Sequence, residues 1–128
     1  MKLLLDTHIW LWTLREPHRI GGRALHALQD ANNELWLSPV SLWEAMILER
    51  KGRIAIHGDL AVWQANATAR FREAPLTHEI VMAAHHLPLH SDPADRFLAA
   101  TAKVLGLTLV TADRRLLGLG DIATLANR

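Results

Sequence analysis

Three short apolar runs, far apart along the chain, constrain the fold most. They are Lys2–Leu5, Leu35–Leu37 and Leu107–Val110. Short runs of this kind are typical of strands that a parallel sheet buries on both faces. The segments between them have the apolar spacing of helices, as parallel crossovers require. The sequence therefore predicts an α/β fold: one domain over residues 1–128, with a central, mostly parallel sheet of four or five short strands and helices on both faces.

The helical segments begin at recognisable signals. Thr7 is the expected N-cap of a short helix over Ile9–Leu14. Ser41 is the expected N-cap of a later helix, and Glu44 follows it at the capping-box spacing. Pro75–Leu76 is predicted to be a short connection or strand. The remaining helices are expected after Gly21–Gly22, after Gly58–Asp59, and over His78–Leu87, Ala94–Leu105 and Arg114–Leu117.

Four carboxylates stand where the ends of these elements should meet. Asp6 directly follows the first run, and Asp113 lies three residues beyond Val110. Glu44 falls in the first turn of its predicted helix, and Asp95 lies near the start of another. Residues just past the C-terminal ends of parallel strands line a common crevice, and crossover helices begin at the same edge. We therefore expect the four acids to converge.

Converging carboxylates repel one another unless a cation joins them or some take up protons. Oxygen ligands in a chain without cysteine suit Mg²⁺, with Mn²⁺ as a possible substitute. Each acid also has a purely structural interpretation: Glu44 as a capping-box partner, Asp95 as a first-turn helix acid and Asp113 as an N-cap. Asp6 is the hardest to explain in this way, because an unpaired acid at the end of a buried run is costly.

Four segments, in order and over nearly the whole chain, resemble the motifs of PIN domains. They are Leu3–His8, Ser38–Glu44, Asp92–Ala102 and Leu109–Asp113. The chain is most similar to the VapC-type toxins of bacterial toxin–antitoxin pairs. The resemblance implies a supporting hydroxyl at Thr111 and four catalytic, metal-binding acids: Asp6, Glu44, Asp95 and Asp113. Asp92 is an additional acid, but the apolar pattern that follows Asp95 matches the family's helix.

The resemblance also implies an activity and partners. The activity is that of an Mg²⁺-dependent endoribonuclease that hydrolyses phosphodiester bonds in structured RNA with a metal-activated water. A toxin of this kind is expected to bind a small cognate antitoxin, which lays a helix in an apolar groove and presents a basic side chain to the acids. The predicted helices over Ile9–Leu14 and Ser41–Lys51 are candidates for that groove or for a homodimer face.

Several basic and aromatic residues are candidates for further contacts. His8, Arg96 and Arg114 lie beside the acids and are possible RNA or antitoxin contacts, as is Arg115. A structural ion pair or ordinary surface exposure explains the arginines equally well. Four tryptophans could stack on unpaired bases, although core packing is the commoner role and Trp10 and Trp12 cannot share one helix face. The four are Trp10, Trp12, Trp43 and Trp63.

Three alternative functions stay open at this point. A zinc site would use His85, His86 and His90 with Asp92, but Pro88 interrupts the helical spacing that such ligands need. An Asp-dependent phosphatase also places an Asp after its first strand, yet the second Asp expected two residues on is here His8. The third alternative is a non-catalytic binding module with a vestigial acidic pocket.

The charge balance is compatible with an RNA partner. The chain has 14 Lys and Arg against 13 Asp and Glu, a net charge of +1. When the four site acids are set aside, nine acidic residues remain against the 14 basic ones, so the rest of the molecule is mildly basic. No apolar run approaches the roughly 18 residues that span a membrane. The cytoplasm is therefore the expected location.

Overall fold

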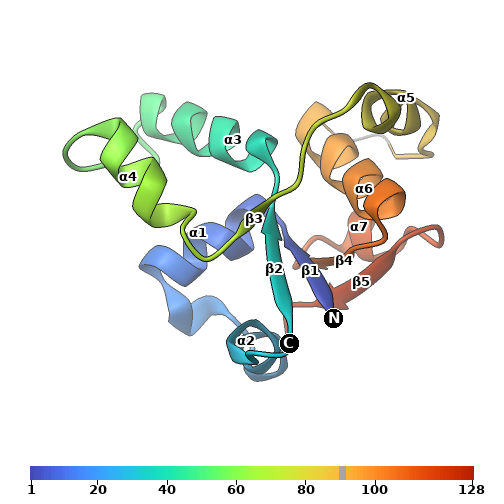
Figure 1. The fold of residues 1–128 in the computed structure, drawn as a ribbon, viewed down its shortest axis with the longest axis horizontal. Coiled ribbons are helices and arrows are strands. Elements are labelled where there is room, and N and C mark those ends of the chain that lie inside the picture. Colours follow the sequence, from blue (N-terminus) through green and yellow to red (C-terminus); the bar gives the residue numbers. More distant parts are fainter. Residues whose placement is uncertain (90–91) are drawn as a thin grey trace.

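The computed structural model describes residues 1–89 and 92–128. At its centre is a five-stranded sheet with the strand order β3-β2-β1-β4-β5, in which every pair of neighbours is parallel (Figure 1). The strands are β1 (Lys2–Leu5), β2 (Glu34–Leu37), β3 (Arg72–Glu73), β4 (Thr108–Thr111) and β5 (Ala123–Ala126). This order puts β1 in the middle, with the end of β4 directly beside it.

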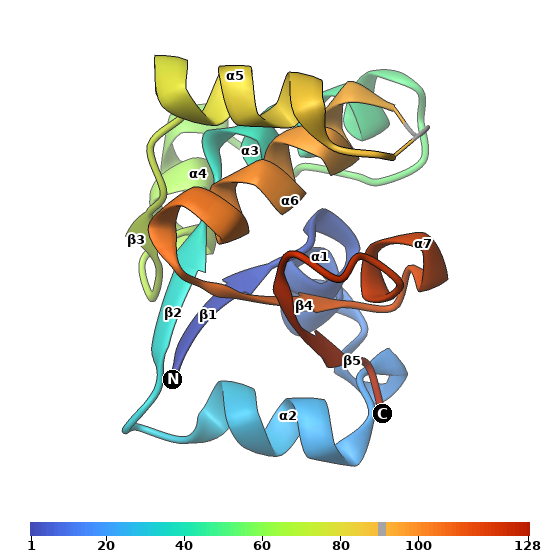
Figure 2. The ribbon, with the colours of Figure 1, turned by 90° about the vertical axis from the view of Figure 1, so that its right-hand side faces the viewer.

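Helices cover both faces of the sheet. Figure 2 shows α2 on one side of it and α5 and α6 on the other, and α1 packs in the same apolar core as α2. The helices are α1 (Thr7–Arg15), α2 (Gly22–Gln29), α3 (Pro39–Arg50), α4 (Leu60–Ala67), α5 (His78–His86), α6 (Pro93–Leu105) and α7 (Arg114–Leu117), with a 3₁₀ helix η1 (Pro17–Arg19). The predicted α/β fold with a parallel sheet flanked by helices on both faces is therefore confirmed.

Strand β1 is buried on both faces because its side chains alternate between two apolar cores. Leu3 and Leu5 pack in the core that contains Trp10 of α1, whereas Leu4 packs in the core that contains Leu98 of α6. All five side chains are fully buried. Burial of a side chain of this size contributes about 1.5–3 kcal/mol. The end of β1, where Asp6 stands, is thus held firmly in place.

Two strands lack the apolar signal that identifies the others. β3 consists of two exposed residues, Arg72 and Glu73, which pair with the end of β2. β5 is only partly buried and completes the sheet beside β4. Pro75–Leu76 is not a strand, because the pairing with β2 occurs three residues earlier. Edge strands are recognised by their backbone pairing, which a hydrophobic pattern does not reveal.

Two predicted helix starts are wrong by a few residues. Ser38, not Ser41, is the N-cap of α3, since its side chain accepts a hydrogen bond from the Val40 N–H and Pro39 fills the first helical position. Glu44 therefore lies beyond the first turn and does not close a capping box with Ser41. Likewise, α1 begins at Thr7 itself, so the Thr7 hydroxyl does not cap it.

The described residues contain no helix that is both long enough and apolar enough to cross a membrane.

Candidate active site

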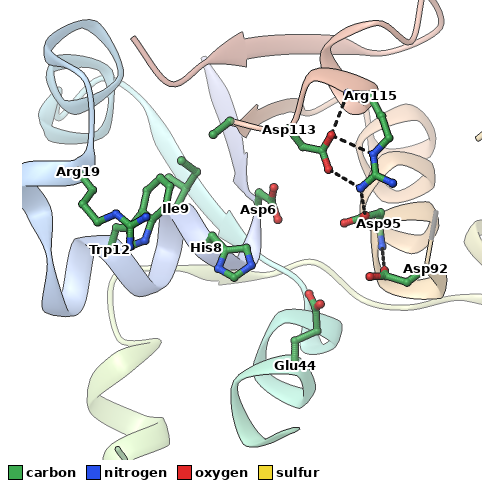
Figure 3. Close-up of a pocket in the computed structure, with 11 residues that line it drawn as sticks. Asp6, His8, Ile9, Trp12, Arg19, Glu44, Asp92, Asp95, Asp113 and Arg115 are labelled. Carbon is green, nitrogen blue, oxygen red and sulfur yellow. Dashed lines mark hydrogen bonds and ion pairs between the residues drawn. The ribbon is translucent and has the colours of Figure 1, made fainter. Parts of the chain in front are cut away.

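The four predicted acids line one pocket at the C-terminal edge of the sheet. Its volume is about 520 Å³. Figure 3 shows Asp6 in the centre, Asp95 and Asp113 on one side, and Glu44 approaching from α3. Each acid comes from a different part of the fold: the end of β1, the body of α3, the first turn of α6 and the segment after β4. The predicted convergence is thus observed for residues that are separated by as much as 107 positions, from 6 to 113.

Asp6 is held by a hydroxyl from the neighbouring strand. Thr111 Oγ1 donates a hydrogen bond of 2.7 Å to Asp6 Oδ2 and accepts one of 3.0 Å from the Asp113 N–H. Asp6 is only 7% exposed. Burial raises the pKa of its carboxyl, and the bond from Thr111 lowers it by a smaller amount. Thr111, where the resemblance implies a supporting hydroxyl, thus contacts both Asp6 and Asp113.

Glu44 is oriented from α1 across the interface with α3. The Thr7 hydroxyl donates a hydrogen bond to Glu44 Oε1, and Thr7 Oγ1 also lies 2.9 Å from Ser41 Oγ. Thr7 and Ser41 are buried. Burial raises the pKa of Glu44, and the bond from Thr7 opposes that shift. The Ser41 that resembled an N-cap therefore belongs to a buried polar group that positions Glu44.

Asp95 and Asp113 share a cation, Arg115. Asp113 Oδ2 lies 3.0 Å from Arg115 Nη2, and Asp113 Oδ1 accepts a 2.8 Å bond from the Arg115 backbone N–H. The same Nη2 lies 3.7 Å from Asp95 Oδ2. Asp113 is also the N-cap of α7, and Asp92 is the N-cap of α6. The structural interpretation of Asp113 as an N-cap is therefore correct, and Asp92 and Asp113 both line the pocket as well.

The two acids of this pair have opposite pKa shifts. Hydrogen bonds from Arg115 lower the pKa of Asp113. Burial raises the pKa of Asp95 to about 6, and repulsion by Asp92, Asp6 and other pocket acids adds to the rise. The ion pair at 3.7 Å does not offset that rise, because the Arg115 side chain is 60% exposed and bonds mainly to Asp113.

The pocket has the donor set of a divalent-cation site, although the ligands are not yet gathered around one point. It offers carboxylate oxygens from several acids, and burial and mutual repulsion raise the pKa values of Asp6, Glu44 and Asp95. Such a set fits a hard cation. Among residues 1–89 and 92–128, no three His, Asp or Glu side chains form a compact metal cluster. Thr7 contacts Glu44, Thr111 contacts Asp6, and Arg115 contacts both Asp95 and Asp113.

The four acids all line the pocket, but only some of the predicted basic contacts do. His8 is exposed and lines the pocket. The Arg96 guanidinium donates hydrogen bonds to the Leu89, Ala84 and His85 carbonyls, so it joins the end of α5 to α6 and does not line the pocket. Arg114 is exposed but lies outside the lining too. Of Arg96, Arg114 and Arg115, the one that lines the pocket is Arg115.

The zinc alternative gains no support from the described residues. His85 and His86 are in edge-to-face contact, with ring centroids 5.1 Å apart. The third residue of that proposal, His90, lies outside the described residues.

One wall of the pocket combines an aromatic with a basic side chain. Trp12 lies one helical turn after His8 on α1, with ring centroids 6.3 Å apart, and the Arg19 guanidinium stacks at 4.4 Å from the Trp12 ring centroid. Trp10, by contrast, is fully buried and donates to the Ala67 carbonyl. The four-residue spacing between His8 and Trp12, which puts both on one helix face, is a signal that could have identified Trp12 as a pocket residue. Arg19 gave none, because only the tertiary structure brings η1 to the pocket.

A parallel α/β sheet with its acids gathered at the ends of strands defines a class of proteins whose reactive site lies at this edge. Comparison with known proteins identifies the family within this class. The PIN domain family model matches residues 3–121. A relative named Ribonuclease VapC22, from Mycobacterium tuberculosis, is 34% identical over 116 residues, which are 89% of this chain and 88% of that protein.

Solved structures show the same fold. The structure of VapBC2 from Rickettsia felis, bound to a DNA fragment from their promoter, superposes with a TM-score of 0.75 at 16% identity and covers 98% of both chains. DNA-bound VapBC from Salmonella typhimurium gives a TM-score of 0.74 at 17% identity and covers 100% of this chain and 99% of that one. This chain belongs to the PIN domain family. Nucleases of that family generally use divalent metal ions.

Proposed function

We propose that this protein is a metal-dependent endoribonuclease that hydrolyses phosphodiester bonds in structured RNA and acts as the toxin of a toxin–antitoxin pair. The observation that carries the proposal is the convergence of Asp6, Glu44, Asp95 and Asp113 in one pocket. The similarity to a protein named as a ribonuclease supports it. Family membership supports the use of a divalent cation.

The same four acids would hold the cation, which we propose to be Mg²⁺, with Mn²⁺ as a substitute. When bound, such a cation supplies Lewis acidity and activates water for attack on phosphorus. The chain's own residues fix the acids: Thr111 holds Asp6, and Thr7 holds Glu44. In the metal-free pocket the pKa of Asp95 is about 6, and a cation bound to its carboxylate would lower that pKa, because a nearby positive charge favours the ionised form.

The decisive experiment compares Asp95→Asn with the wild type. The variant should lose Mg²⁺-dependent cleavage of structured RNA and keep its circular dichroism spectrum. Asp121→Asn is the matched control, because Asp121 pairs with Lys103 on the surface and does not line the pocket. Sequencing the cut ends from cells that express the protein alone would identify the RNA. Undiminished cleavage by Asp95→Asn would contradict the assignment, and no cleavage by wild type with Mg²⁺ would favour a vestigial pocket.

Two apolar grooves on the surface are suited to protein partners. One lies between α3 and α6, has a volume of about 600 Å³ and shares Glu44 and Asp92 with the acidic pocket. Trp43, in this groove, is 54% exposed. The other groove lies beside α1 and α4, has a volume of about 700 Å³ and includes Leu14 and Val62. We propose that a small antitoxin occupies one groove and a second copy of this chain occupies the other.

Substitution of one exposed side chain in each groove tests which groove binds the antitoxin and which binds the second copy. Trp43→Glu and Val62→Glu each put a charge into an apolar surface. One variant should lose co-purification with the antitoxin, and the other should shift from dimer to monomer in light scattering. Retention of both assemblies by both variants would contradict the proposal.

We also propose that the domain spans residues 1–128 and acts in the cytoplasm, where RNA and a cognate antitoxin are available. The pairing of β5 with β4 supports the extension beyond the family match, which ends at residue 121.

A further inference from the structure

The acidic pocket already contains a cation that belongs to the chain. Figure 3 shows the Arg115 side chain reaching from α7 between Asp113 and Asp95. Its Nη2 lies 3.0 Å from Asp113 Oδ2 and 3.7 Å from Asp95 Oδ2, and its Nε lies 3.4 Å from Asp113 Oδ1. In the described part of the chain, Arg115 is the one Lys or Arg side chain that forms ion pairs with the four site acids.

The four acids therefore fall into two pairs with different partners. Asp6 and Glu44 are more deeply buried, and each accepts a hydrogen bond from a neutral hydroxyl, that of Thr111 or Thr7 respectively. Asp95 and Asp113 face the more open side of the pocket and form ion pairs with the positively charged Arg115 guanidinium. A hydroxyl can stay in place beside a carboxylate that binds a metal ion, because it brings no charge. A guanidinium cannot do so without repelling the ion.

The Arg115 side chain is also able to move away from the two acids. Its side chain is 60% exposed, and it projects from α7, which is only four residues long. An exposed ion pair of this kind is weak, so little free energy is lost when it opens. Asp113 would keep its bond from the Arg115 backbone N–H after the side chain has moved. The start of α7 thus stays in place while the guanidinium swings away.

We propose that Arg115 is a resident counter-ion that competes with the divalent cation for Asp95 and Asp113. Without a metal ion, its guanidinium holds the two carboxylates and limits their repulsion. When the cation engages both carboxylates, the guanidinium moves to the mouth of the pocket, where it meets a phosphate of the substrate. This inference rests on the proposed function, since it assumes that these acids bind the cation.

The opposite role would have the opposite consequence. An arginine that orients the two acids for the metal ion would strengthen metal binding, so its removal would weaken binding. A competing arginine weakens metal binding, so its removal strengthens it. The sign of the change in affinity therefore separates the two roles without any measurement of RNA cleavage.

The test is titration calorimetry of the whole protein with MgCl₂, and separately with MnCl₂, at pH 7.5 without RNA. Arg115→Gln should bind the cation about threefold to tenfold more tightly than the wild type, in keeping with the modest strength of an exposed ion pair. Arg115→Lys keeps the charge but loses the planar fork, so it should fall between the two. Arg114→Gln is the matched control for long-range charge, because among the described residues no hydrogen bond or ion pair joins Arg114 to either acid.

A second measurement tests the metal-free half of the proposal. In EDTA, Arg115→Gln should melt at a lower temperature than Arg114→Gln, because two pocket acids have lost their counter-ion. Saturating Mg²⁺ should remove most of that difference. Equal or weaker cation binding by Arg115→Gln would overturn the inference and leave the proposed function standing. If the wild type and all variants fail to bind either cation, the proposed function fails, and the inference fails with it.

Discussion

Thr111 and Asp6 are 105 residues apart in sequence and joined by a 2.7 Å hydrogen bond. The bond exists because β1 and β4 are neighbours, with Leu5 in register with Val110. Both partners are buried. A buried carboxylate at the end of a strand needs such a donor, and the acidic pocket is built around this pair.

Thr111→Val should destabilise the protein because it removes the donor and keeps the shape. We expect a loss of about 1–3 kcal/mol in the free energy of unfolding at pH 7.5, the usual cost of leaving a buried polar group without its partner. Thr111→Ser, which retains the hydroxyl, should lose much less. Urea denaturation without added metal measures both values. Equal losses for Val and Ser would show that the methyl group, and not the hydroxyl, stabilises this position.

The stability of the metal-free protein should depend on the ionisation of Asp95. Its pKa is raised in the folded state from 3.8 to about 6. The folded protein therefore holds this proton more tightly than the unfolded chain, and the carboxyl costs stability as pH rises through that window. Above pH 6, Asp95→Asn should be more stable than the wild type by about 1 kcal/mol, a value discounted for partial exposure.

Thermal melts in EDTA at pH 4 and pH 7.5 check this expectation. The advantage of Asp95→Asn should be present at pH 7.5 and largely absent at pH 4, where the carboxyl is protonated in most folded and many unfolded molecules. Added Mg²⁺ at pH 7.5 should stabilise the wild type more than the variant. An advantage that is independent of pH would rule out ionisation as its cause.

Arg96→Gln should affect stability and leave binding of RNA unchanged. The Arg96 guanidinium bonds to the Ala84 carbonyl at 2.7 Å and to the His85 carbonyl at 3.0 Å. Without the guanidinium, these carbonyls at the end of α5 lose their charged hydrogen-bond donor. The free energy of unfolding should fall by about 1–3 kcal/mol as a result. Urea unfolding and fluorescence anisotropy with a labelled RNA measure the two effects. A large loss of RNA affinity with unchanged stability would instead assign this arginine to RNA contact.

Gly21 and Gly22 should respond in opposite directions to alanine. A Cβ at Gly21 would lie 2.0 Å from the Arg128 backbone carbon, whereas a Cβ at Gly22 meets nothing within 4 Å. The Arg128 carbonyl accepts hydrogen bonds from the Arg23 and Ala24 N–H groups at the start of α2. Gly21→Ala should therefore displace this segment and cost about 1–3 kcal/mol, as overpacking does.

Gly22→Ala is the matched control for that change. It should be neutral or stabilising by up to about 1 kcal/mol, because alanine lowers the entropy of the unfolded chain and favours the helix. Both values come from urea unfolding at one pH. Similar losses for the two variants would show that the start of α2, rather than contact with Arg128, requires glycine.

The sequence by itself determined where β1, β2, β4 and the candidate site acids lie along the chain. Apolar runs on both faces require a buried parallel sheet, and an acid directly after such a run must lie at its C-terminal edge. For this reason the sequence pattern alone is enough to place Asp6 and Asp113. The polar pair Arg72–Glu73 could not be placed in this way, because an exposed edge strand carries no apolar pattern.

Only the tertiary structure decided which side chains are partners. Ser41 and Ser38 are both suitable N-caps by type, and the packing of α1 on α3 turned Ser41 toward Thr7. Arg96 and Arg115 are both close in sequence to site acids, yet one bonds to backbone carbonyls and the other to the acids. Sequence spacing determines which face of an element a residue occupies. The partner that meets that face depends on how elements distant in sequence pack together.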